Sequence, residues 1–530
     1  MPTDCISYQN SGYFSKLIVD YLNQEPAVRS FYHRFPTLEN FKLQIEEKAA
    51  AFPIENRKVL TTALRRQYSR FETSDATQQN IAQLENTKTF TITTGHQLNL
   101  FTGPLYFLYK IVSTINLAKQ LKTAYPEYHF VPVYWMATED HDFEEINYFY
   151  FKNKKIHWNR ESFGPVGRLS TQGLEEVFEV FSKELGAGTN AETLRNLFRK
   201  AYLEHSNLAD ATRYIANELF KKEGLVIVDG DDSDLKQLFV PYIKEELLQQ
   251  TSHKKVTETI AHFNEYTVQV NPREINLFYI EDELRERIIA ENGTYKINNT
   301  QRFFTETEML AEVASHPEKF SPNVILRPLY QEIILPNLCY IGGGGEIAYW
   351  LELKSNFETF KVTFPILLIR NSVLLAYQKQ ADKADALSLS WSDLFLKQDY
   401  LINKKTQELS AFNLDFSEQK QFLREQFAQL NTIAAKTDAS FSGAVKAQEA
   451  KQLKGLEHLE KRLLKAEKKI HQNRLERIVQ LQSELFPNQS LQERKNNFSE
   501  FYLTDGEGLT TKLLDTLNPL SSDFSIIYLQ

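Results

Sequence analysis

The sequence predicts an α/β protein built on a parallel sheet, and three observations carry this prediction. Residues 90–151 are typical of a strand, a glycine turn, a helix and a second strand, which together make a βαβ unit. The apolar, β-branched run at residues 225–228 passes into acidic residues and glycine, as a buried parallel strand does where it enters a turn. A further apolar run at residues 364–370 returns to the sheet and completes it.

The βαβ unit places the candidate site. Its first strand ends at Gly95, and the turn that holds Gly103 and Pro104 opens a helix with apolar residues at helical spacing. Proline suits a first helical turn, because its missing N–H would have no partner there. The second strand, residues 130–136, ends in a cluster of acidic and imidazole side chains. Parallel sheets bind ligands beyond the carboxyl ends of their strands, so we expect the site here.

The remaining chain divides around this unit. At 530 residues it is too long for one ordinary core. We expect an α/β core over residues 1–375, whose first 88 residues are mainly helical. Two insertions interrupt the core, at about residues 152–215 and at about 265–320, and the second is mostly β because residues 267–270 alternate in period two. A helical arm follows over residues 376–486, and residues 487–530 dock back on the core.

The arm has the pattern of a short coiled coil. Glycine nearly vanishes after residue 376, and Gln, Lys, Glu and Leu dominate. Apolar residues spaced by three and four run from Leu456 to Ile470, slip at Asn473 and resume from Ile478 to Leu485. Such a seam packs on a neighbouring helix of its own chain or on a second subunit, and we expect a homodimer.

Composition excludes some classes of function. The net charge of −8, from 61 basic and 69 acidic residues, disfavours a general nucleic-acid or anionic-membrane binder. No stretch of eighteen apolar residues occurs, which predicts no membrane span. Cys5 and Cys339 provide neither a disulfide framework nor a thiolate metal cluster, so we expect a reducing cytoplasm.

The acidic stretch after the second strand supplies the candidate catalytic residues. Clustered carboxylates repel one another, so stability alone gives little reason to place them at a strand end. They could bind an amine, accept sugar hydroxyls, hold a divalent cation or act as a general base; a solvated acidic loop is the structural alternative. No second histidine lies at ligand spacing, so we predict no metal. In extended conformation Asp140 and Asp142 would share one face. The candidates are Glu139, Asp140, His141 and Asp142, with Lys110 from the preceding helix.

Two glycine-rich stretches are candidate ligand-binding walls. The turn at Gly95 and Gly103 would let the backbone approach a ligand, and the helix start at Pro104 would offer N–H groups to an anion. It matches no phosphate-binding motif, and a structural turn remains an alternative. The run of four glycines at residues 342–345 would form the opposite wall of the same cleft or a structural bend.

Four segments, in this order and spacing, carry a family resemblance over essentially the whole chain. They are TTGHQLNLFTGPLYFLYK, VPVYWMATEDHDFEEIN, FSPNVILRPLYQEIILPNLCYIGGGGEIAYW and NQSLQERKNNF. They resemble the bacillithiol biosynthesis cysteine-adding enzymes. The resemblance implies a Rossmann-like core with two connecting insertions, similar to class I aminoacyl-tRNA synthetases, and a coiled-coil arm that forms a homodimer. It implies the joining of cysteine to the glucosamine amine of malyl-glucosamine.

The resemblance also implies the site residues. The substrate-binding candidates at matching motif positions are Gly95, Gln97, Thr102, Gly103, Tyr106, Tyr109, Arg327, Gln331, Gly342, Gly343, Gly345, Glu346, Tyr349 and Trp350. The chain departs from the family pattern at His96, where glutamine is usual, and at Gly344, where proline is common. An obligatory imidazole at position 96 is therefore not expected.

The implied chemistry is amide formation, which requires an activated carboxylate and a neutral amine. ATP is the expected activating cofactor, although the chain lacks the HIGH and KMSKS signatures. The partners expected are the small-molecule substrates and a second copy of the chain, with no nucleic acid and no membrane. Two alternatives stay open: a nucleotidyltransferase acting on another small acid, and a coiled-coil scaffold with an inactive core.

Overall fold

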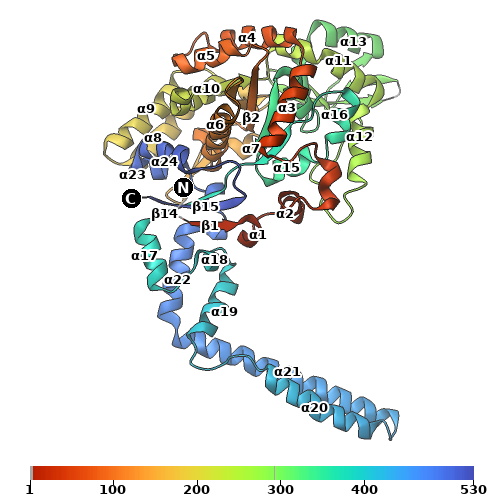
Figure 1. Ribbon diagram of the computed structural model, residues 1–530, viewed down its shortest axis with the longest axis vertical. Coiled ribbons are helices and arrows are strands. Elements are labelled where there is room, and N and C mark those ends of the chain that lie inside the picture. The colour runs from red at the N-terminus through yellow and green to blue at the C-terminus, as the bar shows by residue number, and fades with distance from the viewer. Residues whose placement is uncertain (1–3, 292, 530) are drawn as a thin grey trace. The chain divides into compact units, whose positions relative to one another are not determined.

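The computed structural model describes residues 4–291 and 293–529, which form two compact units (Figure 1). The first unit takes in the chain up to residue 375 and again from residue 491, and the second comprises residues 376–490. Within the described residues, every helix is either too short or too polar to cross a lipid bilayer.

A five-stranded parallel sheet forms the centre of the first unit. Its order is β13-β12-β2-β3-β6, and every neighbouring pair is parallel. Its strands are β2 (Thr89–His96), β3 (His129–Met136), β6 (Val226–Asp229), β12 (Asn337–Gly342) and β13 (Ile366–Ile369). In register, Gly342 pairs with Ile369 and Met136 with Asp229, so the carboxyl ends of the strands meet at one edge. The predicted parallel sheet is confirmed.

Helices cover this sheet, as the apolar spacing predicts. Helix α6 (Tyr106–Ala124) follows β2 in the chain and begins two residues later than the predicted start at Pro104. Leu117 and Leu121 of α6 pack with Phe90 and Ile92 of β2 in one buried cluster. The other helices of the core are α2 (Lys16–Leu22), α3 (Leu38–Ala51), α4 (Ile54–Tyr68), α5 (Asp75–Gln83), α11 (Ser233–Gln249), α14 (Arg327–Ile334), α15 (Gly344–Trp350) and α16 (Lys354–Phe360).

The segment between β3 and β6 is a β-hairpin followed by three helices. The hairpin is β4 (Tyr148–Phe151) with β5 (Lys154–His157). The helices are α8 (Leu174–Leu185), α9 (Thr189–Leu203) and α10 (Leu208–Phe220). The short helix α7 (Phe143–Ile146) links β3 to this hairpin.

The segment between α12 (Thr251–Ile260) and α14 carries a second, antiparallel sheet of order β10-β9-β8-β7-β11. Its strands are β7 (Leu277–Glu281), β8 (Leu284–Glu291), β9 (Thr294–Ile297), β10 (Phe303–Thr305) and β11 (Phe320–Pro322), with α13 (Glu306–Ser315) between the last two. The strand predicted at residues 267–270 is wrong. Those residues form a loop, because the N–H groups of Gln269 and Val270 donate to the carboxylate of Glu352 instead of to a neighbouring strand.

The two ends of the chain meet in a third sheet of the first unit. Strand β1 (Asp4–Ser7) pairs antiparallel with β15 (Asp523–Leu529), which neighbours β14 (Val373–Tyr377). Between residue 491 and β15 lie α23 (Phe498–Asp505) and α24 (Gly508–Thr516). The carbonyls of Leu514 and Leu517 accept hydrogen bonds from Asn116 of α6, at 2.8 and 2.7 Å. The last forty residues are therefore part of the core.

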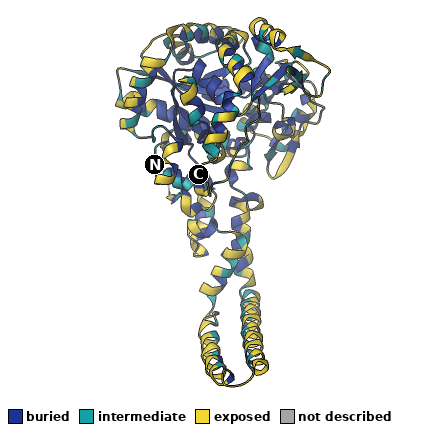
Figure 2. Ribbon diagram, turned by 90° about the vertical axis from the view of Figure 1, so that its right-hand side faces the viewer, coloured by how far each residue is buried: buried dark blue, intermediate teal, exposed yellow. Residues whose placement is uncertain are grey.

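The second unit is helical throughout its described elements. Helices α20 (Ser417–Ala434) and α21 (Ala439–Ile470) pack as a hairpin around Phe427, Ala434 and Val445, and most of their remaining surface is exposed (Figure 2). The predicted slip in the seam lies at Asn473, and the helix breaks two residues earlier, at His471, where α21 gives way to α22 (Gln472–Leu485). Leu475, Ile478, Leu481 and Leu485 of α22 are buried. The remaining helices are α17 (Gln378–Ala386), α18 (Trp391–Leu394) and α19 (Gln398–Leu409).

Candidate active site

A cavity of about 490 Å³ opens where the strands of the parallel sheet end. It is lined by His96 at the end of β2, by Met136 at the end of β3, by Gly343 directly after β12 and by Arg370 directly after β13. The position at the carboxyl ends of parallel strands is the one expected for a ligand site. The structure brings together at this cavity, from the residues predicted by sequence, Gly95, Gln97, Tyr106, Lys110, Glu139, Asp140, Arg327, Gly343, Gly345, Glu346 and Tyr349.

Other predicted residues lie outside the lining, several of them directly behind it. Trp350 is fully buried and stacks on the lining residue Tyr340, with ring centroids 4.5 Å apart. Gln331 is also fully buried and accepts a hydrogen bond from Arg327 at 3.0 Å. Gly342 brings β12 close to α15, since an added Cβ would lie 2.9 Å from the Cβ of Glu346. These three residues support the wall without facing the cavity.

The glycine turn before α6 does not form the predicted anion site. Thr102, Gly103 and Tyr109 do not line the cavity, and Thr102 and Tyr109 are buried. The N–H of Leu105 donates to the carbonyl of Asn496 at 2.8 Å, so the start of the helix already has a partner. The carbonyl of Gly103, which has a φ of 62°, accepts from Asn497 Nδ2 at 2.6 Å. The turn docks the C-terminal part of the chain.

Lys110 and Glu346 form a buried ion pair between the two predicted walls. Lys110 Nζ lies 2.5 Å from Glu346 Oε2 and donates to the carbonyl of Gly95 at 2.7 Å. Glu346 also accepts from the Tyr340 hydroxyl at 2.7 Å and from the Gly343 N–H at 2.9 Å. Burial lowers the pKa of Lys110, and Glu346 offsets this only in part. An ammonium has three N–H groups, so the third remains available to a ligand.

His96 lines the same wall as a neutral imidazole. Its ring is buried beside Tyr106, with centroids 5.4 Å apart, and its Nε2 has no hydrogen-bond partner among the described residues. Burial, with Lys110 nearby, holds the pKa of His96 well below its usual range. The side chain can therefore exchange a hydrogen bond with a ligand, but it carries no charge at neutral pH.

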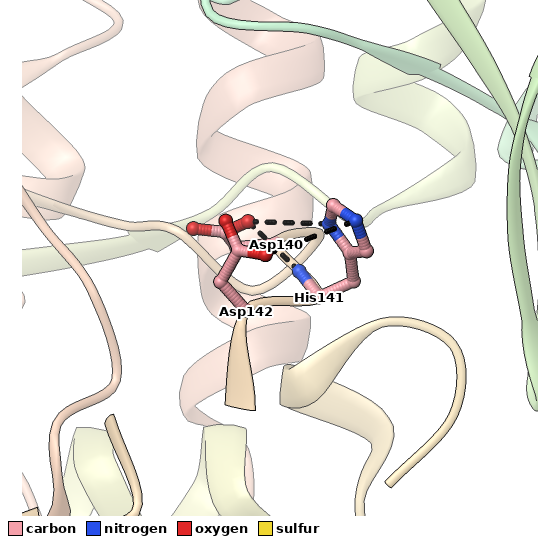
Figure 3. Close-up of side chains that lie close together, drawn as sticks. All are labelled: Asp140, His141 and Asp142. Atoms are coloured by element: carbon pink, nitrogen blue, oxygen red, sulfur yellow. Dashed lines mark hydrogen bonds and ion pairs between the residues drawn. The ribbon is translucent and has the colours of Figure 1, made fainter. Parts of the chain in front are cut away.

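The acidic stretch is a turn, so the predicted extended conformation is wrong. Strand β3 ends at Met136, and the N–H of Asp140 then bonds back to the carbonyl of Ala137 at 3.3 Å. Asp140 and Asp142 therefore do not alternate along a strand, although their carboxylates still lie close to each other and to His141 (Figure 3). Asp140 lines the cavity, whereas the side chain of Asp142 is 55% exposed and does not.

Two members of the stretch are held by specific partners. Glu139 pairs with Lys236, a fully buried residue of α11. Asp140 accepts from Gln97 Nε2 at 3.0 Å and from the N–H of His141 at 2.8 Å. Burial would raise the pKa of Asp140, but the side chains of His141 and Gln97 and the nearby Arg285 together hold it well below its usual range. Asp140 is thus an ionised carboxylate at the cavity wall.

Two family descriptions match the chain almost end to end. The bacillithiol biosynthesis BshC N-terminal Rossmann-like domain matches residues 1–371, and the BshC C-terminal coiled-coil domain matches residues 373–529. The chain belongs to the BshC family. This confirms the predicted resemblance and the Rossmann-like and coiled-coil fold class.

Curated relatives match over the same length. A protein of Flavobacterium johnsoniae named "Putative cysteine ligase BshC" is 65% identical over 527 residues, which cover 99% of this chain and 100% of that one. Proteins of the same name are 65% identical in Flavobacterium psychrophilum, over 99% of both chains, and 38% identical in Cytophaga hutchinsonii, over 97% of this chain and 96% of that one. A solved Campylobacter jejuni structure titled "putative arginyl t-RNA synthetase" aligns at 12% identity and a TM-score of 0.20, over 87% of this chain and 97% of that one, which is too low to show a shared fold.

Arg285 shapes the chemistry of the acidic turn. It comes from β8, and its Nη1 lies 2.5 Å from His141 Nδ1. Asp140, His141 and Asp142 offer atoms within 4.8 Å of one another, the spacing that a metal ion would need. A guanidinium that donates to one of those atoms repels a divalent cation and occupies a potential ligand. Arg285 thus competes with any cation at this turn.

Sequence reasoning missed several residues of this site. Arg370 directly follows β13 and Asp229 ends β6, so the strand-end rule that found the acidic turn would also have found them. Asp229 Oδ1 accepts from the hydroxyl of Thr138, a lining residue, at 2.5 Å. Burial, together with the neighbouring Asp231, raises the pKa of Asp229 to about 6. Arg285 and Arg494 also line the cavity, but no local pattern marks them, because they come from distant segments.

Proposed function

We propose that this protein joins L-cysteine to the glucosamine amine of malyl-glucosamine and so completes bacillithiol. The family membership over the whole chain supports this reaction, as does the name cysteine ligase carried by the relatives. The observation that carries the proposal at the level of chemistry is that charged side chains of both signs line one cavity. Asp140 and Glu346 are acidic lining residues, while Lys110, Arg327 and Arg494 are basic ones.

The residues at the cavity suit the two reacting groups. A new C–N bond forms when a neutral amine attacks an activated carboxyl carbon; the activating group leaves, and the amine loses a proton. Asp140 stays ionised, so it fits the ammonium group of cysteine better than it fits proton transfer. Asp229 has a raised pKa and reaches the cavity through the Thr138 hydroxyl, which suits it to receive the amine proton. The free N–H of Lys110 and the His96 ring can steady the developing negative charge.

ATP is the proposed activating co-substrate. Its role when bound would be to convert a carboxylate oxygen into a leaving group. The glycine turn before α6 does not fit phosphates, because Thr102 and Gly103 do not line the cavity and the N–H groups of Gly103 and Leu105 already donate to carbonyls. The cationic side chains at the cavity do fit them in charge. Arg327 would be a residue to hold phosphate groups, since guanidinium matches phosphate oxygens in pairs.

We also propose a homodimer formed through the helical hairpin of the second unit. The large apolar residues Phe422, Leu430, Ile433, Phe441, Leu459 and Ile470 of α20 and α21 are between 44% and 71% exposed in the single chain. Covering them against a second copy would remove apolar surface from water. Cys5 and Cys339 are free thiols and the substrate is itself a thiol, so we place the protein in the reducing cytoplasm.

The test is reconstitution with purified protein. Cysteine, malyl-glucosamine and ATP should give a product with the mass of bacillithiol, and omission of ATP should abolish it. In the source organism, deletion of the gene should remove bacillithiol and accumulate malyl-glucosamine. Normal bacillithiol in a deletion strain that holds no second copy would refute the proposed function. Product formed without ATP would refute only the proposed activation.

A further inference from the structure

Residues 491–497, here called the return segment, are the first part of the chain to re-enter the first unit. The side chain of Gln492 accepts from the N–H of Leu375 and donates to its carbonyl, both at 2.9 Å. Asn497 Nδ2 donates to the carbonyls of Phe101 and Gly103, at 2.7 and 2.6 Å. Both side chains are buried, so the return segment is fixed near each end.

Glu493 fixes the middle of the return segment. Its carboxylate accepts hydrogen bonds from both terminal nitrogens of Arg370, at 2.7 and 3.0 Å, and from the N–H of Val373 at 3.0 Å. Glu493 is 1% exposed and Arg370 is 3% exposed. Removal of one member of a buried ion pair is strongly destabilising, because the other charge is left without a partner. This pair therefore determines where the backbone of the next residue lies.

That next residue, Arg494, lines the cavity. Its backbone N–H donates to the carbonyl of Leu491 at 3.0 Å, but its guanidinium makes no hydrogen bond and no ion pair with any other residue that the structure describes. An exposed arginine is usually solvated, so this fact alone would carry nothing. Arg370 supplies the second observation. Its Nε is buried and has no acceptor among the described residues, although the rest of its guanidinium is paired. A buried N–H without a partner costs free energy, which a ligand oxygen would recover.

Arg327 adds a third guanidinium at the same cavity. Its partners among the described residues are neutral, namely Gln331 at 3.0 Å and Tyr349 at 3.3 Å. Arg327 and Arg494 therefore face the cavity without a carboxylate of their own, and the adjacent Arg370 keeps one free N–H. Like charges gathered in this way repel one another unless an anion lies between them.

We propose that Arg494 is a substrate-binding residue, which holds an anionic group of a substrate together with Arg327 and the Nε of Arg370. The anionic group is a carboxylate or a phosphate, because the planar fork of arginine matches the oxygen pairs of both. Glu493 acts as the positioning residue for Arg494. This inference rests on the proposed function, since it names the place of one substrate group in that same cavity.

The test compares Arg494→Gln with the matched control Lys495→Gln. Lys495 is the adjacent residue, but its Nζ lies 3.3 Å from the centre of the Tyr150 ring and does not line the cavity. Calorimetric titration with malyl-glucosamine and, separately, with ATP gives each affinity without turnover. We expect Arg494→Gln to weaken one ligand by roughly ten- to a hundredfold, the range for a charged hydrogen bond. Lys495→Gln should stay within about twofold of the wild type.

The ligand that weakens identifies the anion. A loss confined to malyl-glucosamine assigns Arg494 to its carboxylates, and a loss confined to ATP assigns it to phosphates. Wild-type affinity for both ligands in a normally folded Arg494→Gln protein would overturn the inference. Failure of this inference can be told apart from failure of the proposed function: a protein that binds an anion through Arg494 but makes no bacillithiol would refute the reaction and leave this binding role standing.

Discussion

Asp140 stays ionised in the cavity wall because neighbouring hydrogen-bond donors and a nearby positive charge replace the hydration that it loses on burial. Gln97 and the His141 backbone donate to it, and Arg285 lies close by. A carboxylate held in this way is a good partner for an ammonium group and a poor proton acceptor at neutral pH. The neighbouring Asp142 is more than half exposed and lacks this surrounding. The two aspartates therefore lie in different environments, although the local sequence gives no reason to distinguish them.

Substitution of each aspartate by asparagine tests this separation. Asp140→Asn should lower kcat/KM for cysteine roughly a hundredfold, mainly through KM, because a charged contact to the ammonium is lost. Asp142→Asn should stay within about tenfold of the wild type. Steady-state kinetics with cysteine as the varied substrate measures both. The reverse order of effects would return the principal role to Asp142.

Glu352 is a second carboxylate tied to the cavity. It is fully buried, and its oxygens accept from the N–H groups of Gln269 at 2.6 Å and Val270 at 3.3 Å. Both of those residues line the cavity. No lysine or arginine of the described chain pairs with Glu352, and burial raises its pKa to about 7. The loop at residues 267–270 is therefore held by a group that titrates near neutrality.

The raised pKa predicts a definite pH dependence of stability. Between about pH 4.5 and about pH 7 the folded carboxyl keeps a proton that the unfolded one has lost, so the free energy of unfolding falls as the pH rises. Glutamine does not titrate, so the melting temperature of Glu352→Gln, relative to the wild type, should rise from about pH 5 to about pH 8. Thermal denaturation at several pH values measures this. The exposed Glu358→Gln is the control, and a pH-independent difference for Glu352→Gln would refute the assignment.

At the scale of elements, strands were easier to predict than turns. The buried apolar runs of β3 and β6 can be recognised from composition, and the strand-end rule then finds Glu139 and Asp140. The turn before α6 looked like an anion site because glycine, proline and a helix start are its local features. Its N–H and carbonyl groups instead meet Asn496 and Asn497, which lie almost four hundred residues away in sequence. No local pattern could reveal that contact.

The hairpin of α20 and α21 shows the same limit. The seam spacing predicted a coiled coil, and α20 and α21 of the same chain do pack against each other as a helical hairpin. The second half of the seam, in α22, is buried within its own unit, whereas Leu459 and Ile470 in the first half are 53% and 71% exposed. The repeat therefore marks apolar positions but does not say which of them a second chain would cover.

Replacement of Leu459 and Leu463 by aspartate tests the proposed dimer. Both residues lie on α21, Leu459 exposed and Leu463 half-buried. An interface cannot bury unpaired carboxylates without a large cost, so the double variant should be monomeric by light scattering. Its helix content by circular dichroism should match the wild type, since little of either side chain is needed inside one chain. A variant that keeps the dimer mass would place the interface elsewhere.

At the scale of the whole molecule, the order of the domains along the chain can be predicted from sequence, but the long-range contacts that complete the cavity cannot. Apolar spacing and composition separate a Rossmann-like core from a helical arm. The cavity, however, needs Arg285 from the antiparallel sheet and Arg494 from the return segment. Both reach it only through pairings between segments far apart in sequence. Strand order and cavity lining depend on such pairings, and hydrophobic periodicity carries no information about them.

The pairing of the two chain ends has a consequence for how the protein is made. Translation produces residues 1–375 long before Glu493, and domains generally fold in the order of synthesis. Until residue 493 emerges from the ribosome, Arg370 lacks its carboxylate, and β1 and β14 lack β15. The nascent core thus carries an uncompensated charge and open strand edges, which favour aggregation. The first unit is accordingly completed only after the arm has been synthesised, and a chain truncated anywhere in the arm lacks both Glu493 and Arg494.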